Sequence, residues 1–164
     1  MDPLLIIIGL LVLLLAYFVL VIITSRKAIE THRKFQRKAD ENKRIVLEYY
    51  ETVLNGKKDE LVPKYLYENY IQHDPFIATG EQAAAAEVHS LNKLFPDRKT
   101  EIKRVLAEGD YVFLHSLIIN EPANTGDKGI AAIDIFRLEN GMMAEHWNVS
   151  QPVPEKPANQ NTMF

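Results

Sequence analysis

The sequence predicts an α+β fold in which a curved antiparallel sheet wraps around N-terminal helices, preceded by one transmembrane helix. Three observations support this. An uncharged apolar run fills residues 3–23, apolar residues then recur every three or four positions, and after Pro96 they recur every second position. Helices followed by hairpin-linked strands are typical of the α+β class, and a sheet curved around helices leaves a pocket between them.

The first element is the apolar run from Pro3 to Ile23. As a helix it would be about 31 Å long, which matches the hydrocarbon core of a bilayer. Asp2 is the only charged side chain before it and no small-residue cleavage pattern follows, so a transmembrane helix is favoured over a cleaved signal peptide or a buried core helix. We expect residues 1–25 to be a membrane anchor that contacts the bilayer through residues 3–23.

The charge is distributed unevenly around the net value of −3. Residues 24–44 carry eight Lys or Arg against three acidic side chains, and the chain from Ile45 onward is acidic. Basic flanks stay on the cytoplasmic side, so we expect a basic helical stalk over residues 26–41 and a single-pass membrane protein with a cytoplasmic C-terminal domain. The acidic body argues against a nucleic-acid partner. The absence of cysteine excludes a disulfide scaffold and a cysteine nucleophile.

The body is expected over residues 42–150. Its first helix begins near Asn42 and ends at Asn55-Gly56, because Gly commonly follows a helix C-terminus. A short helix over 59–67, a short strand over 70–73 and an Ala-rich helix over 80–95 follow. Period-two segments then predict strands over 99–108, 111–120, 129–139 and 142–150, with hairpin turns at 109–110 and 140–141. The Pro-rich tail over 151–164 should be irregular.

Asp134 is the first candidate for chemistry. Alternation along its strand places Asp134 on the same face as Phe136 and Leu138. A carboxylate on an apolar face is desolvated, which makes it a stronger base near neutral pH. The alternative is a structural aspartate bonded to a neighbouring strand or to an arginine.

The histidines give further candidates. His73 closes the short strand, where it either donates to a substrate at the pocket rim or simply precedes the turn that Asp74 initiates. His115 lies mid-strand and is either a cavity residue or a neutral core histidine. His146 and Trp147 are neighbours on the last strand, so they point to opposite faces and only one of them can enter the pocket.

No metal or cofactor is expected. The histidines and carboxylates of the body show no H-E-x-x-H or comparable ligand spacing. The sequence also has no G-x-S-x-G, no phosphate-binding loop and no G-x-G-x-x-G, so serine hydrolase and nucleotide-binding functions have no support.

Four segments carry a resemblance to a known family. They are Tyr70-Ile-Gln-His-Asp-Pro75, Leu94-Phe-Pro-Asp97, Ile133-Asp-Ile-Phe-Arg137 and the run from Glu139 to Trp147. In this order they resemble the SnoaL-like polyketide cyclase family of the nuclear-transport-factor-2-like (NTF2-like) superfamily, over about residues 42–164. The ending from Gln151 to Phe164 resembles a subgroup described as predicted aldol-condensation enzymes.

The resemblance implies a cone-shaped sheet around the helices, often paired as a homodimer through the sheet, and chemistry without metal or organic cofactor. It assigns acid/base catalysis to the aspartate at Asp134, a pocket histidine to His73 and a second polar pocket residue to His115. The other residues expected to line the substrate pocket are Tyr70, Asp74, Phe136, His146 and Trp147. The membrane helix and the stalk depart from the family pattern.

Three functions remain open on this basis. In the first, Asp134 removes a proton next to a carbonyl of a small-molecule substrate, and His73 or His115 hydrogen-bonds the enolate oxygen before an aldol closure or isomerisation. In the second, the domain is a tethered module that binds an apolar ligand or a protein partner without reaction. The third is a metal-dependent hydrolase.

Overall fold

The computed structural model describes residues 2–164. The chain divides into two compact units, of which the first ends at Arg37 and the second spans Lys38–Phe164. One helix, α1 (Pro3–Tyr49), begins in the first unit and ends in the second. No Gly or Pro occurs between Arg26 and Tyr49, so nothing breaks the helix where the sequence changes from polar stalk to amphipathic helix.

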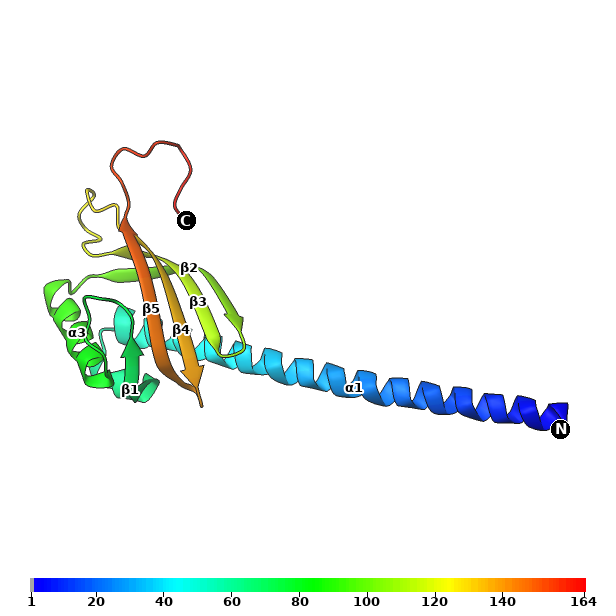
Figure 1. The fold of residues 1–164 in the computed structure, drawn as a ribbon. Helices are drawn as coiled ribbons and strands as arrows, with labels where there is room; N and C mark the ends of the chain where they lie inside the picture. Colours follow the sequence, from blue (N-terminus) through cyan, green and yellow to red (C-terminus); the bar gives the residue numbers. More distant parts are fainter. Residues whose placement is uncertain (1) are drawn as a thin grey trace. The chain divides into compact units, whose positions relative to one another are not determined.

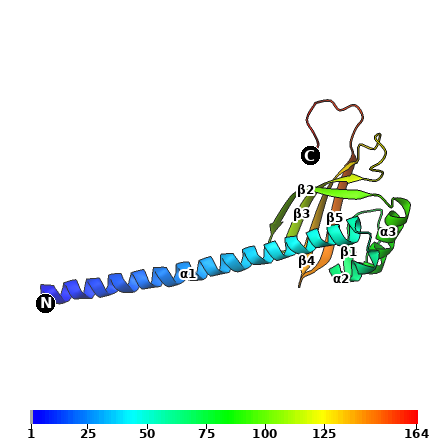
Figure 2. The same cartoon turned by 180° about the vertical axis from the view of Figure 1, so that it is seen from behind.

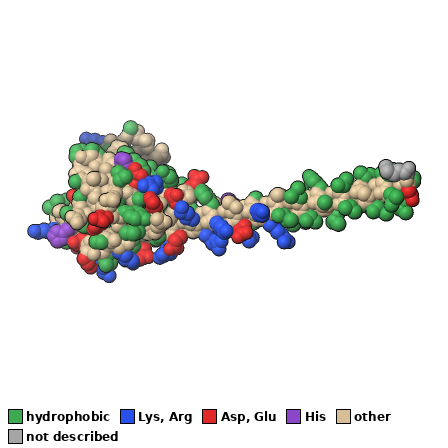
Figure 3. Space-filling model, turned by 60° about the horizontal axis from the view of Figure 1, so that its bottom comes forward, with side chains coloured by type: hydrophobic (Ala, Val, Ile, Leu, Met, Phe, Trp, Pro, Cys, Tyr) green, Lys and Arg blue, Asp and Glu red, His purple; other side chains and the backbone are tan. Residues whose placement is uncertain are grey.

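The first unit consists of the N-terminal part of α1. Apolar side chains cover its first turns and Lys and Arg side chains follow (Figure 3). The apolar stretch is long enough to cross a membrane and none of it is buried in the described structure. The length and apolar composition of this stretch suit a membrane span, and a signal sequence has the same two properties.

The second unit contains the remaining elements (Figure 1). A π-helical turn (Tyr50–Asn55) continues α1, and a 3₁₀ turn (Asp59–Leu61) leads into the short helix α2 (Val62–Tyr65). The other helix is α3 (Glu81–Leu94). The strands are β1 (Leu66–Gln72), β2 (Lys99–Glu108), β3 (Tyr111–Ile119), β4 (Ile130–Glu139) and β5 (Met142–Pro152).

The five strands form one curved sheet in the order β1-β5-β4-β3-β2. Pairs from β2 to β5 are antiparallel, as predicted, and Asn140-Gly141 makes the β4–β5 turn with both residues at positive φ. β1 pairs with β5 in parallel and begins at Leu66, so the helix expected over 59–67 ends earlier. Residues after Pro152 form neither helix nor strand.

The hydrophobic core lies between one face of the sheet and the helices (Figure 2). Val46 and Val53 from the helical side meet Val112, Leu114 and Leu138 from the sheet, and all five are at most 1% exposed. Full burial of each such side chain contributes roughly 1.5–3 kcal/mol. The alternating burial along β3 and β4 shows that the sheet has an inner face, which covers this core, and an outer face.

Candidate functional site

A cavity of about 280 Å³ opens beside the core, between the inner face of the sheet and the helices. Its wall is apolar where α3 and the sheet contribute Val88, Leu91, Ile118 and Ile130. The polar and titratable side chains that also line it are Tyr49, Tyr50, Tyr70, Gln72, Asp74, Glu87, Arg98, Thr100, Asp134, His146, Asn148 and Ser150. An apolar pocket with a few convergent polar groups is the usual form of a small-molecule site.

Asp134 lies in this cavity wall and is only 5% exposed. The sheet register pairs it with Asn148 on β5, whose Nδ2 donates to Asp134 Oδ1 at 2.7 Å. His146, two residues earlier on the same strand, brings its Nε2 to 3.0 Å from the same oxygen. Asp134 therefore lies on the inner face, which it shares with Phe136 and Leu138, and β5 supplies both of its hydrogen-bond partners.

The hydrogen bonds of His146 define where its protons lie. Gln72 Oε1 accepts the backbone N–H of Asp74 at 3.0 Å, which identifies this atom as the amide oxygen. It lies 3.1 Å from His146 Nδ1, so Nδ1 carries a hydrogen and donates. The single proton between His146 Nε2 and Asp134 Oδ1 then belongs to either group, giving an imidazolium–carboxylate pair or a neutral imidazole with a carboxylic acid.

The ring of Phe136 packs on the face of the His146 imidazole. The two rings stack with centroids 4.3 Å apart and planes 12° from parallel. Phe136 is 3% exposed and pairs with His146 across β4 and β5. The imidazole is thus fixed by a stacked ring, an amide and a carboxylate.

Three tyrosines place hydroxyl groups around the carboxylate. Burial raises the pKa of Tyr49, Tyr50 and Tyr70, and the negative charge of Asp134 adds to each shift. All three phenols therefore stay protonated at neutral pH and can donate a hydrogen bond inside the cavity.

Tyr70, which lies on β1, and Asp74, which follows the end of β1, also line the cavity. Together with Asp134, Phe136 and His146 they are the sequence-selected residues that the fold brings to one site.

His73 and Trp147 lie on the outer face of the sheet instead. Their rings stack with centroids 4.5 Å apart, and His73 Nε2 lies 2.8 Å from Glu145 Oε1. Arg137 Nε donates to the other oxygen of Glu145 at 2.8 Å. Between His146 and Trp147 it is therefore the histidine that enters the cavity, because neighbours on a strand point to opposite faces.

His115 is on the outer face as well. Its Nδ1 lies 3.0 Å from Arg104 Nη1, and its ring stacks on Phe164 at the end of the tail with centroids 5.6 Å apart. Its neighbours on β3, Leu114 and Ser116, take the inner positions and are at most 1% exposed. His115 is thus separated from Asp134 by the sheet.

Several cavity residues were not selected from the sequence. Gln72 lies two residues after Tyr70 on β1, and Asn148 lies two residues after His146 on β5. Residues two apart on a strand share a face, so this spacing could have identified both. Tyr50 belongs to the helical apolar pattern, which also describes an ordinary core residue. Arg98 precedes β2 and carries no local signal.

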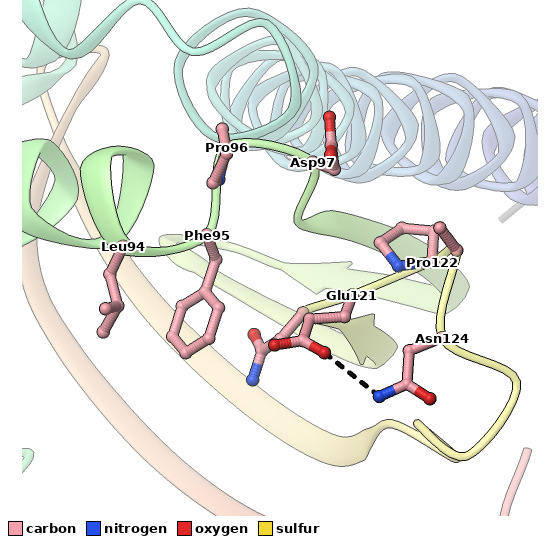
Figure 4. A pocket seen from close by; sticks show the side chains of 9 residues that line it. Leu94, Phe95, Pro96, Asp97, Glu121, Pro122 and Asn124 are labelled. Carbon is pink, nitrogen blue, oxygen red and sulfur yellow. Dashed lines mark hydrogen bonds between the residues drawn. The ribbon is translucent and has the colours of Figure 1, made fainter.

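A second hollow of about 470 Å³ lies between the end of α3 and the loop after β3 (Figure 4). Its titratable groups are Asp97 and Glu121, and Glu121 Oε2 accepts a hydrogen bond from Asn124 at 3.0 Å. The cavity at Asp134 is the better candidate site, because it combines burial, a fixed histidine and protonated phenols.

Within residues 2–164, no three His, Asp or Glu side chains come together in a way that could hold a metal ion.

A model of the SnoaL-like polyketide cyclase family matches residues 44–155. This range includes β1 to β5 and every polar residue that lines the cavity. A search of curated proteins found no significant match.

Solved structures share the fold. A candidate polyketide cyclase from Bacillus cereus is 24% identical, with 70% of this chain and 77% of that chain covered and a TM-score of 0.59. A candidate ketosteroid isomerase from Kribbella flavida is 18% identical, with 77% and 90% covered and a TM-score of 0.59. TsrD from Streptomyces laurentii is 16% identical, with 68% and 88% covered and a TM-score of 0.57. At these identities the likeness shows the fold alone.

Proposed function

Because the chain belongs to the SnoaL-like polyketide cyclase family, we propose that it is a cofactor-free acid/base enzyme of the aldol-condensation, cyclase or isomerase type. Its substrate is a small enolisable carbonyl compound. The observation that carries the proposal is the buried Asp134 carboxylate, held by His146 and Asn148 in the wall of a largely apolar cavity.

In this proposal Asp134 is the base. Its carboxylate takes a proton from the carbon next to the substrate carbonyl, and the electron pair of the broken C–H bond moves onto the carbonyl oxygen as an enolate. In an aldol closure the enolate carbon then attacks a second carbonyl, whose oxygen becomes an alkoxide and takes the proton from Asp134. In an isomerisation Asp134 instead returns the proton to a different carbon of the conjugated enolate. His146 orients the carboxylate and shares its proton.

The enolate oxygen needs hydrogen-bond donors. The protonated phenols of Tyr50 and Tyr70 line the cavity with Asp134 and supply them. They replace His73 and His115 in this role, because both histidines lie on the outer face. Asp74 and Phe136 complete the substrate pocket.

Hydrogen exchange tests the proposal. The full chain, purified in detergent, is incubated in deuterated water with small enolisable ketones and keto acids, and deuterium uptake is followed by NMR. Asp134→Asn should slow the enzyme-dependent exchange by about 10²–10⁴-fold, the usual contribution of a general base.

Asp40→Asn is the matched control, since Asp40 is an exposed carboxylate on α1. It should exchange like the wild type. Asp134→Asn must keep the wild-type circular dichroism spectrum. Full exchange in a folded Asp134→Asn protein would contradict the assignment of the base.

A tethered binding module is the second candidate function. The apolar stretch of α1 favours it, because this stretch is unburied in the described structure and would hold the domain at a membrane. In that case the cavity holds an apolar ligand and Asp134→Asn changes ligand affinity or stability only.

We further propose the organisation of the whole chain. Residues 1–25 anchor it in the membrane as a single span, residues 26–41 form the basic stalk, residues 42–150 form the catalytic domain in the cytoplasm, and residues 151–164 form the tail. The basic side chains after the span support this orientation.

We also propose a homodimer through the outer face of the sheet. The exposed apolar side chains Leu106, Ile133 and Val149 support it, and the molecular mass of the purified protein in solution would test it.

A further inference from the structure

The guanidinium of Arg98 is a charged group of the cavity that the proposed reaction does not use. Arg98 lies just before β2 and lines the same cavity as Asp134. Its Nε is buried, and no hydrogen-bond partner for that atom exists among residues 2–164. No Asp or Glu in the same range lies within ion-pair distance of its side chain.

An arginine placed in this way is costly. Buried charges in proteins are normally paired, because the lost hydration must be replaced. The carboxylates of Asp134 and Glu87 line the cavity and act on Arg98 through space, without contacting it. Burial accordingly lowers the pKa of the Arg98 guanidinium, although an arginine stays charged at neutral pH.

Lys57 adds a second positive charge beside it. Lys57 Nζ donates to the backbone oxygen of Arg98 at 2.7 Å. Burial and the neighbouring charge of Arg98 lower the pKa of Lys57. Lys57 itself does not line the cavity, so the unpaired donor of this part of the wall is Arg98 Nε.

We propose that the substrate is a small organic acid whose carboxylate binds Arg98 while its enolisable carbonyl reaches Asp134. The inference rests on the proposed function and specifies its substrate class. A planar carboxylate matches the two-pronged donor geometry of a guanidinium. It carries one negative charge, whereas a doubly charged phosphate would be repelled more strongly by Asp134 and Glu87.

The size of the cavity agrees with a small acid. Its volume of about 280 Å³ is just below the range of about 300–1,000 Å³ that ligand pockets occupy, so it suits a small ligand. The ionised acid supplies the acceptor that the buried Nε lacks.

Matched acid and ester probes test the inference. Levulinate and benzoylpropionate are compared with their methyl esters, which keep the ketone and remove the charge. Binding to the full chain in detergent is measured by titration calorimetry. The wild type should bind each acid about tenfold or more tightly than its ester, and Arg98→Met should remove this preference with little effect on the esters.

Two further variants make the test specific. Arg98→Lys keeps the charge and should retain part of the preference, and Arg104→Met removes an exposed arginine of the outer face and should bind like the wild type. Ligand-free Arg98→Met should melt no lower than the wild type, because an unpaired buried charge is removed.

Three results would overturn the inference: equal binding of acid and ester, unchanged acid binding by Arg98→Met, or no binding of either acid to the wild type. Its failure differs from that of the proposed function. If Asp134→Asn exchanges normally while Arg98 still selects acids, the base assignment fails and the acid site stands.

Discussion

At the level of single residues, a row of three partly or fully buried side chains leads to the proposed base. Gln72, His146 and Asp134 are connected in series, and the backbone N–H of Asp74 determines which atom of Gln72 accepts. Because this donor is part of the chain backbone, the histidine tautomer is set by the fold rather than by solvent. The series therefore leaves one proton, which His146 Nε2 and Asp134 Oδ1 share.

Ser116 provides a prediction about stability at this scale. Its side chain is 0% exposed, and within residues 2–164 its Oγ has no hydrogen-bond partner. An unsatisfied buried hydroxyl costs about 1–3 kcal/mol, so Ser116→Ala should leave the free energy of unfolding unchanged or raise it by about 1 kcal/mol. Urea denaturation of the full chain measures this change.

Thr52→Val is the contrasting variant. Thr52 Oγ1 donates to the backbone oxygen of Glu48 at 2.6 Å and lies 3.1 Å from the Tyr65 hydroxyl. Removing this satisfied hydroxyl should lower the free energy of unfolding by about 1 kcal/mol. A comparable loss in Ser116→Ala would show that Ser116 has a partner.

At the level of elements, Glu48 ties α1 to α2. Its Oε1 accepts hydrogen bonds from Lys64 Nζ and Tyr65 Oη, both at 2.8 Å, and its Oε2 accepts from Arg44 at 2.8 Å. The hydrogen bonds from Lys64 and Tyr65 lower the pKa of Glu48 to about 2. Since the Glu48 side chain is partly exposed, solvent weakens its ion pairs with Lys64 and Arg44, and the prediction is one of direction.

The lowered pKa predicts a pH dependence. The unfolded chain binds a proton at Glu48 near the ordinary pKa of 4.5, whereas the folded chain binds it only near 2, so the stabilisation is complete above pH 4.5 and is lost as the pH falls toward 2. Glu48→Gln should destabilise the protein at pH 7 and flatten the stability profile over this window. Denaturant unfolding at several pH values checks both effects.

Lys103→Gln serves as the control for this pH series, because Lys103 pairs with Glu101 on β2, far along the chain from Glu48. It should leave the contribution of Glu48 in place. A Glu48→Gln profile that parallels the wild type would contradict the prediction.

At the edge of the sheet, the local sequence pattern did not predict the secondary structure. Residues 66 and 67 were expected to be the end of a helix, yet β1 begins at Leu66 and pairs in parallel with β5, with Leu66 opposite Met143. Leu66 is 2% exposed and Met143 is fully buried, so pairing at this edge buries both. Tertiary pairing overrides a weak local helical preference.

At the level of the whole molecule, membrane attachment is the property to test. Val12 lies in the middle of the apolar stretch. Val12→Arg should cost about 2.5–3.5 kcal/mol on insertion, which should move the chain from the membrane fraction to the soluble fraction of a cell lysate. Val12→Leu is the matched control and should stay with the membrane.

Two outcomes would contradict the anchor. One is a wild-type chain whose intact mass shows that the N-terminal segment has been cleaved, and the other is an uncleaved wild type found in the soluble fraction. A reporter fused to Phe164 would show on which side of the membrane the body lies.

The sequence by itself determined the α+β class, the order of the antiparallel strands along the chain and the strand face that Asp134 shares with Phe136 and Leu138. These follow from short-range periodicity, since alternation assigns a strand's two faces and Asn140-Gly141 specifies a tight turn. The family membership was also accessible, because several motifs occur in the correct order.

Only the tertiary structure decided which polar residues share the cavity. The positions of His73, His115 and His146 relative to Asp134 depend on strand register and on the inner and outer faces of the sheet, which no local pattern defines. Arg98 is the clearest case. Its position just before β2 looks ordinary in sequence, and only the fold places its Nε, buried and without a hydrogen-bond partner in the described chain, in the wall that also holds Asp134.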